Sequence, residues 1–118
     1  MQTNKENLVV QTSFEFALLI IDFIASLEEV KKFSLANQLF RSGTSIGANI
    51  REAQNAESKN DFIHKMKIAA KEADETEYWL LLCKHAKTLP DPGSLLPKLE
   101  SVQKILSKII ATSKRSIQ

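Results

Sequence analysis

The sequence predicts an all-α protein, an antiparallel up-and-down four-helix bundle that forms a single domain. Apolar residues recur at steps of three and four along almost the whole chain, and the period-two alternation of β-strands is absent. Prolines occur only at positions 90, 92 and 97, so most of the chain is free of helix breakers. A length of 118 residues suits one domain with one hydrophobic core.

Local signals place the helix ends. Ser58 followed by Asp61 resembles a capping box, so a third helix is expected to begin there. The stretch TLPDPGS (88–94) is a turn, and Ser94 is expected to cap a fourth helix in which Pro97 falls in the harmless first turn. Short connections favour neighbouring helices that run in opposite directions. The four expected helices span about 7–31, 34–56, 59–87 and 95–115.

Heptad-like rows of apolar and small residues follow the second, third and fourth helices. Rows with alternating steps of four and three pack at shallow angles in bundles, so these residues are expected to form the core. The rows are Ala36, Leu39, Gly43, Ile46, Ile50 and Ala53; Phe62, Met66, Ala69, Ala73, Thr76, Leu80 and Cys83; and Leu95, Leu99, Val102, Leu106 and Ile109.

The first helix is apolar nearly all round. One row holds Val10, Ala17, Ile20, Ile24 and Leu27, and a second holds Val9, Phe16, Phe23 and Val30. A bundle covers one broad face of each helix, so another copy of the chain is expected to cover the rest. The alternative is a wide core stripe with a few stray surface residues. The expected contacts between copies are Phe16, Leu19, Phe23 and Val30.

Two of the three glycines, Gly43 and Gly47, lie four residues apart within the second helix. No strand precedes them and no Gly-Lys-Ser/Thr signature follows, which argues against a phosphate-binding loop. Charged neighbours exclude a membrane glycine pair. A glycine inside a helix costs about 1 kcal/mol relative to alanine, so close packing is the expected compensation. The expected bulky neighbours are Trp79, Tyr78 and Phe40.

The stretch from Leu39 to Trp79 carries a recognisable motif: an Arg-Ser pair, then Ser-Ile-x-x-Asn-Ile, then an acidic residue, then two glutamates three apart on the following helix. It resembles the small bacterial four-helix-bundle proteins found as reading frames inside intervening sequences of 23S ribosomal RNA genes. The resemblance covers the second and third helices in sequence and all four in architecture. The matching residues are Arg41-Ser42, Ser45 to Ile50, Glu52, Glu72 and Glu75.

The resemblance implies a bundle that assembles as a ring-like homopentamer. A related accessory protein of diversity-generating retroelements is a basic pentamer that associates with a reverse transcriptase and with nucleic acid. For most members of the resembled family no activity is established. The chain is therefore expected to associate with itself, and with RNA, DNA or a partner protein.

Arg41 is expected to form a polar clasp with the third helix. In a hairpin that turns near Ser58, Arg41 lies opposite Glu75, and its planar guanidinium suits two parallel bonds to a carboxylate. Glu72 is expected to share the pair. The alternative is a ligand pocket that also uses Asn49 and Glu52, the other polar residues of the motif.

Enzyme chemistry finds little support. Di-iron bundles need two Glu-x-x-His motifs, whereas the nearest match, Asp61-x-x-His64, occurs once. Cys83 lies on the core row, where a thiol is normally inert. No catalytic residue, metal, cofactor or small-molecule substrate is expected. The alternative is a metal-dependent enzyme that uses the carboxylates of Glu52, Glu72 and Glu75.

Charge is distributed unevenly along the chain. Residues 1–83 carry 9 basic and 12 acidic side chains, whereas residues 84–118 carry 7 basic and 2 acidic ones. The fourth helix lacks aromatic residues for base stacking, so any nucleic-acid binding there would be independent of sequence. A merely solvated helix face is the alternative. The candidate nucleic-acid contacts are Lys98, Lys104, Lys108, Lys114 and Arg115.

Location is expected to be cytoplasmic. A single cysteine excludes an internal disulfide, and the N-terminus lacks the pattern of a secretion signal. The most apolar stretch, residues 14–27, is interrupted by two acidic residues and is too short for a bilayer. The sequence therefore predicts a non-enzymatic, self-assembling scaffold without a membrane segment.

Overall fold

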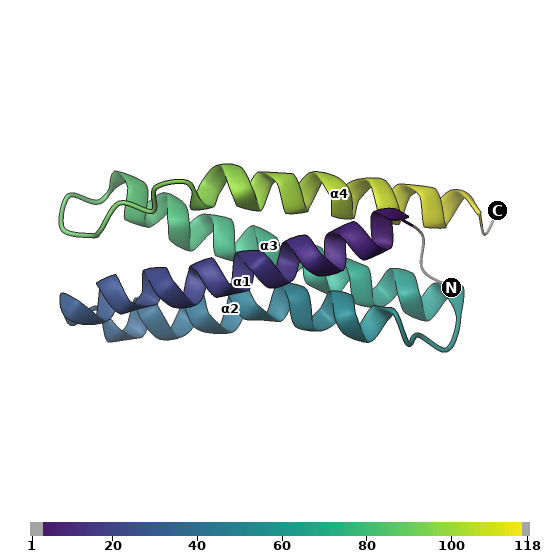
Figure 1. Ribbon diagram of the computed structural model, residues 1–118, viewed down its shortest axis with the longest axis horizontal. Helices are drawn as coiled ribbons and strands as arrows, with labels where there is room; N and C mark the ends of the chain where they lie inside the picture. The colour runs from purple at the N-terminus through teal and green to yellow at the C-terminus, as the bar shows by residue number, and fades with distance from the viewer. Residues whose placement is uncertain (1–3, 117–118) are drawn as a thin grey trace.

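The computed structural model describes residues 4–116, with side chains from residue 7 onward. Within that range all regular structure is helical, as predicted. The molecule is elongated, with extents of 49 × 20 × 19 Å (Figure 1). Its four helices are α1 (Asn4–Glu29), α2 (Phe33–Ala53), α3 (Lys59–His85) and α4 (Leu95–Arg115). Their bounds agree with the expected ones to within one helical turn.

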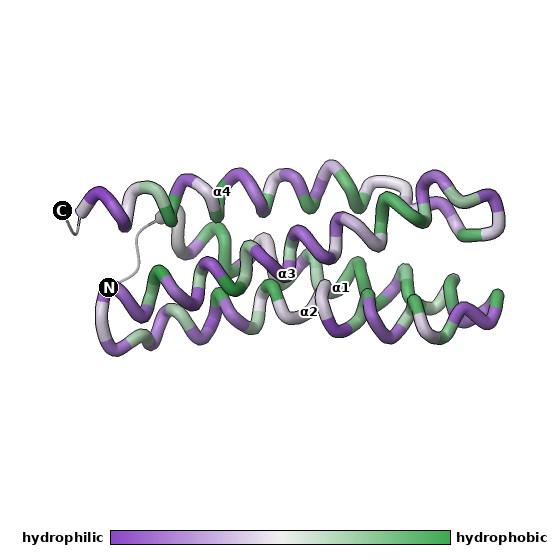
Figure 2. The backbone as a smooth tube through the Cα atoms, turned by 180° about the vertical axis from the view of Figure 1, so that it is seen from behind, coloured by the Kyte–Doolittle hydropathy of each residue, from purple (hydrophilic) through white to green (hydrophobic). Residues whose placement is uncertain are grey.

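The helices surround one core in the order α1, α2, α3, α4. In the described part of the chain α2 packs against α1 and α3, and α4 packs against α3 and α1. The diagonal pairs, α1 with α3 and α2 with α4, are therefore separated by the core. Figure 2 shows hydrophobic and hydrophilic positions alternating along the helices, as expected where one side of each faces the core.

The predicted core rows of α2 and α4 are fully confirmed, since every predicted member is buried. In α3 the first member is wrong: Ile63 is buried, whereas Phe62 is only partly buried. In α1 the buried row draws on both predicted rows, because a helix that is apolar all round does not reveal which side faces inward. The buried apolar residues of α1 are Val9, Phe16, Ile20, Ile24 and Leu27.

One helix start and one helix end have clear local causes. The Ser58 hydroxyl accepts a bond from the Asp61 amide at 3.0 Å, and the Glu57 amide donates to the Asp61 carboxylate, so α3 begins where predicted. The expected cap by Ser94 is wrong: its backbone is not extended, and its side chain makes no capping bond. α1 ends at the turn where Lys31 adopts a left-handed φ of 63°.

α1 also has the length and hydropathy of a membrane span, over Asn7–Glu29. Core helices of soluble proteins meet the same criterion. In this fold α1 supplies buried side chains to the core, which accounts for part of its apolar character. The absence of a membrane segment stays a prediction.

Candidate functional site

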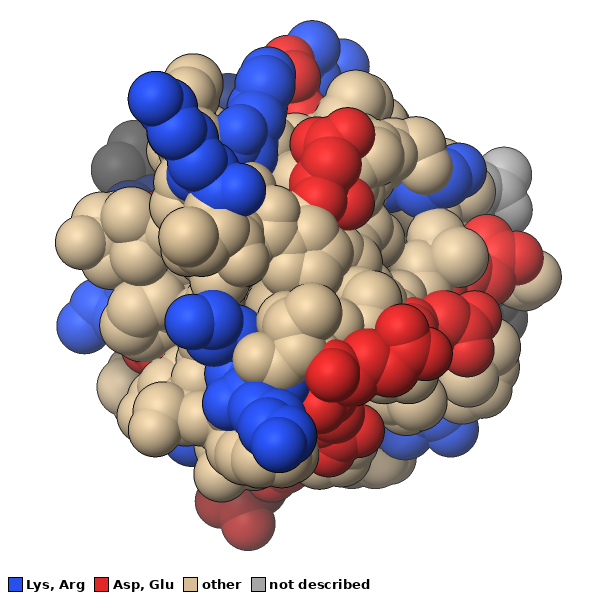
Figure 3. All heavy atoms as spheres, turned by 90° about the vertical axis from the view of Figure 1, so that its left-hand side faces the viewer, with Lys and Arg blue, Asp and Glu red and all other residues tan. Residues whose placement is uncertain are grey.

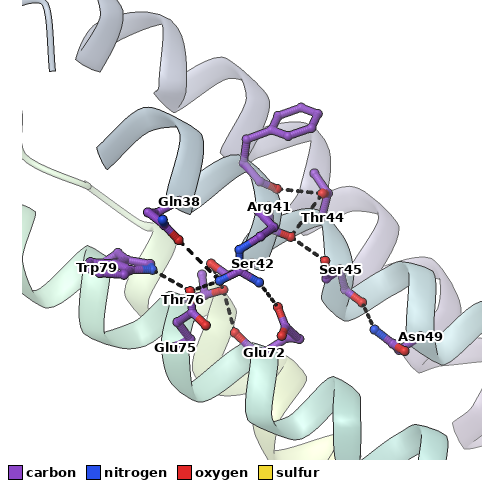
Figure 4. A network of polar contacts seen from close by, with 11 residues as sticks. Gln38, Arg41, Ser42, Thr44, Ser45, Asn49, Glu72, Glu75, Thr76 and Trp79 are labelled. Carbon is purple, nitrogen blue, oxygen red and sulfur yellow. Dashed lines mark hydrogen bonds and ion pairs between the residues drawn. The ribbon is translucent and has the colours of Figure 1, made fainter. Parts of the chain in front are cut away.

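The clasp joins α2 to α3 through one guanidinium. Arg41 Nη1 lies 3.1 Å from Glu72 Oε2, and Nη2 forms an ion pair with Glu75 Oε2 (Figure 4). The indole N–H of Trp79 donates to the same Glu75 oxygen at 3.0 Å. Glu72 and Glu75 lie one turn apart, so Arg41 spans a turn of α3 with its two arms.

Electrostatics within the clasp favour the charged forms. Hydrogen bonds from Arg41 and then from Trp79 hold the pKa of Glu75 below its usual range. The bond to Glu75 is also the main reason that the pKa of Arg41 is raised. The Arg41 side chain is 49% exposed, so solvent screens the pair, and we interpret the clasp as a link between helices.

A buried pair of hydroxyls lies beneath the clasp. Ser42 and Thr76 are both fully buried, and their oxygens are 2.9 Å apart. The Thr76 hydroxyl also lies 2.8 Å from the backbone carbonyl oxygen of Glu72. A hydroxyl has one proton, so when Thr76 donates to that carbonyl, the Ser42 hydroxyl donates to the Thr76 oxygen. Sequence reasoning missed this pair. The available signal was a hydroxyl in the core row of α3 facing a Ser in the motif on α2.

Asn49 and Glu52 lie apart from the clasp. The Asn49 side chain donates to the Ser45 carbonyl in its own helix at 2.8 Å. Glu52 is exposed in the last turn of α2, about three turns from Arg41. The five motif residues therefore do not converge on one site, because Asn49 is rotated about 80° around α2 from Arg41 and Glu52 lies about three turns further along the helix.

The two glycines pack against α1, and the expected neighbour Trp79 is wrong. A Cβ at Gly43 would lie 2.9 Å from Ile20 Cγ2, and one at Gly47 would lie 3.4 Å from Ser13 Oγ. Trp79 lies on the α3 side, in the clasp and edge-on to Tyr78 with ring centroids 5.2 Å apart. The glycines thus let α1 approach α2 closely, as a packing role requires.

Large apolar side chains remain exposed along α1 and α2, and we call five of them the α1–α2 apolar face. Phe14 lines an open hollow with Val10, Ala17 and Ala48, at the junction of the two helices. The expected contact Phe16 is wrong, because it is only 2% exposed within one chain. Leu19 and Phe23 are partly buried against the core, while Val30 is 47% exposed. The α1–α2 apolar face comprises Phe14, Leu18, Ile21, Phe33 and Phe40.

A second exposed apolar group, Tyr78, Leu81 and Leu82, lies on α3. Because α3 is diagonal to α1 across the core, this group and the outer side of α1 face different directions.

The basic residues of α4 do not form one continuous row. Lys104 pairs with Glu100 at 3.1 Å, and Arg115 donates to Thr112 in its own helix. Lys98 lines a hollow between α1 and α4. Lys108 and Lys114 are exposed. Figure 3, which views the end carrying the α1–α2 and α3–α4 connections, shows basic and acidic side chains gathered on different parts of that end.

A model of the 23S rRNA-intervening sequence protein family matches residues 5–108. The chain belongs to this family. Among solved structures it is similar to a protein of unknown function from the S23 ribosomal protein family of Bacteroides thetaiotaomicron. That likeness has 45% identity and a TM-score of 0.82, and it covers 86% of this chain and 97% of the other. No curated protein matches the chain.

For this family member the carboxylates do not form a common donor set. Glu72 and Glu75 both face Arg41, whereas Glu52 lies elsewhere on α2. Among the described residues no group of three or more His, Cys, Asp or Glu side chains comes together. Burial raises the pKa of the Cys83 thiol to about 11, which disfavours the reactive thiolate.

Proposed function

We propose that the protein is a non-enzymatic scaffold that assembles with copies of itself through the α1–α2 apolar face. The supporting observation is that Phe14, Leu18 and Ile21 are each about half exposed on a helix whose other side is already buried. Soluble monomers rarely expose large contiguous apolar patches, and covering the exposed half of one such side chain contributes about 1 kcal/mol, roughly half the value for complete burial.

The proposed assembly is a ring, and the number five rests on the resemblance to pentameric relatives. The proposal takes the chain as an antiparallel up-and-down bundle, which the contacts of Ile20 with Gly43 and of Ser13 with Gly47 support. Because the apolar group on α3 faces away from α1, one copy can set its α1–α2 apolar face against α3 of the next. Contacts between unlike surfaces propagate around a ring, whereas a two-fold dimer uses one surface twice.

The scaffold is proposed to act in the cytoplasm, where its polar surfaces bind nucleic acid or a partner protein. The excess of basic residues after position 83 supports an anionic partner.

Paired variants test the self-assembly. The double change Leu18→Gln and Ile21→Gln should release single copies of 13.3 kDa, measured by sedimentation velocity, with helical content retained by circular dichroism. Leu8→Gln is the matched control, since Leu8 is equally exposed on α1 but outside the face, and it should sediment as the unaltered protein does. If the double variant keeps the mass of the unaltered protein, the proposed interface is wrong.

A further inference from the structure

The exposed apolar group on α3 lies at the same height along the bundle as the middle of the α1–α2 apolar face. The hydrogen bond between the buried hydroxyls of Ser42 and Thr76 places these two residues level with each other. Phe40 lies two residues before Ser42, and Tyr78 lies two residues after Thr76. In the proposed antiparallel bundle both steps lead toward the same end, so Phe40 and Tyr78 are level as well.

Ile21 of α1 lies at nearly the same height. A Cβ at Gly43 would lie 2.9 Å from Ile20 Cγ2, which places Ile20 level with Gly43. Ile21 is therefore about two residues, or ~3 Å, from the height of Phe40. Both side chains are about half exposed, so the face offers one apolar side chain from each helix at the height of Tyr78.

Both surfaces continue toward the same end of the bundle with a charged or basic residue. Glu28 lies seven residues after Ile21, and His85 lies seven residues after Tyr78. Seven residues are close to two turns, so each residue shares the side of its apolar partner and lies about 10 Å further along. Glu28 and His85 are therefore also at similar heights, on the two surfaces that the proposed assembly brings together.

The last turns of α1 and α3 carry opposite charge. α1 ends with Glu28 and Glu29, whereas α3 ends with Lys84 and His85. At this end of the bundle Figure 3 shows acidic and basic side chains on different parts. All four are exposed, and within the described part of the chain none of them forms an ion pair. The negative end of a helix dipole disfavours acidic residues in the last turn, so a cation from another chain would be favourable beside Glu28.

The other charged residues of this end lie in the turns after α1 and α3, and among the described residues they form no ion pair with these four. They are Lys31, Lys32, Lys87 and Asp91.

We propose that copies of the chain meet side by side at equal height, with Tyr78 of one copy against Ile21 and Phe40 of the next and His85 opposite Glu28. This rests on the proposed self-assembly and deepens it by fixing the register of the contact. Copies related by rotation about an axis along the bundle keep the same height, so residues at equal heights meet. A second copy supplies both the aromatic side chain and the basic residue at the heights that the face requires.

Cross-linking between two introduced cysteines tests this register. The double variant Glu28→Cys with His85→Cys is treated with a short bismaleimide, and the products are separated on a denaturing gel. The native Cys83 is buried, with its pKa raised to about 11, so it should not react. The matched control is Glu28→Cys with Lys71→Cys, because Lys71 lies on the same side of α3 as His85 but about 21 Å before it.

The proposed register predicts a ladder of covalent oligomers for the double variant and none for the control. Each single cysteine variant should give no covalent dimer. An equal mixture of the two single variants should give covalent dimers and nothing larger, because each contact uses two different surfaces.

Exchange of charge at the same two positions tests the pair without cysteines. Glu28→Lys alone and His85→Glu alone should each raise the concentration of half-assembly by up to about fivefold in sedimentation velocity, the range for exposed ion pairs. The two changes together should restore the original value. If the cysteines themselves dissociate the assembly, this exchange decides, and a combined variant that assembles no better than either single one contradicts the pair.

Two results separate failure of the register from failure of self-assembly. An assembled double cysteine variant that gives no covalent oligomers, or none beyond the dimer, would overturn the register and leave self-assembly intact. Unaltered protein that sediments at 13.3 kDa would overturn both.

Discussion

At the scale of single residues, the clasp and the glycines show how far spacing predicts contacts. The numbering of a helical hairpin predicted that Arg41 faces Glu75, and the two form an ion pair. Trp79, one of the bulky residues expected beside Gly43, was wrong, because spacing along one helix does not say which adjacent helix a residue faces. Contacts across a known turn are therefore predictable, whereas contacts with a helix of unknown rotation are not.

The clasp should make stability depend on pH in acid. The folded-state pKa of Glu75 is depressed, so the contribution is present above the ordinary value of 4.5 and is lost as pH falls through the lower folded value. Arg41→Met should lower Tm by a few degrees at pH 7, and this difference should close below pH 4.5 in thermal melts followed by circular dichroism. Arg51→Met, at an exposed arginine of the same helix, should give no such pH-dependent difference. A gap for Arg41→Met that stays constant with pH would contradict the electrostatic account.

The two helical glycines should respond to alanine with opposite signs. At Gly47 the new Cβ would make an ordinary contact with Ser13, so Gly47→Ala should stabilise by about 0.5–1 kcal/mol through helix propensity. At Gly43 it would approach Ile20 to 2.9 Å, and overpacking of this kind costs about 1–3 kcal/mol. Urea unfolding at one protein concentration measures both. Changes of the same sign would show that the distance to α1 does not control the outcome.

At the scale of elements, amphipathic rows predicted α2 and α4 completely and α1 poorly. When a helix has one apolar side, the sequence indicates which side faces the core. α1 carries apolar residues on nearly every side, so its sequence does not determine which side faces inward. Phe16 was therefore assigned to the outside although it is buried. The buried pair Ser42 and Thr76 was missed for a related reason, since its partners come from two helices whose register only the fold sets.

The start of α3 should depend on its cap, and the start of α4 should not. Ser58→Ala removes the acceptor for the Asp61 amide and should cost about 1 kcal/mol in urea unfolding. Ser94→Ala should change the free energy of unfolding by much less, because the Ser94 side chain makes no capping bond. If the two variants lost equal free energy of unfolding, the hydrogen bond from the Asp61 amide to Ser58 would not be what stabilises the start of α3.

At the scale of the whole molecule, the sequence predicts the four-helix fold but does not identify what covers its exposed apolar surface. The core rows bury one side of each helix, and what remains is an unusual outer surface on α1 and α2 with Phe14, Phe33 and Phe40 each at least half exposed. Family membership supports the fold but assigns no chemical activity, because the similar solved protein is itself of unknown function. A scaffold role therefore requires that copies of the chain cover that surface.

The mass of the purified protein in solution, measured by multi-angle light scattering, tests this most directly. Self-assembly predicts a discrete species of several times 13.3 kDa, five times if the resembled ring is formed, that persists on dilution through the micromolar range. A stable species of 13.3 kDa across the same range would contradict the scaffold account.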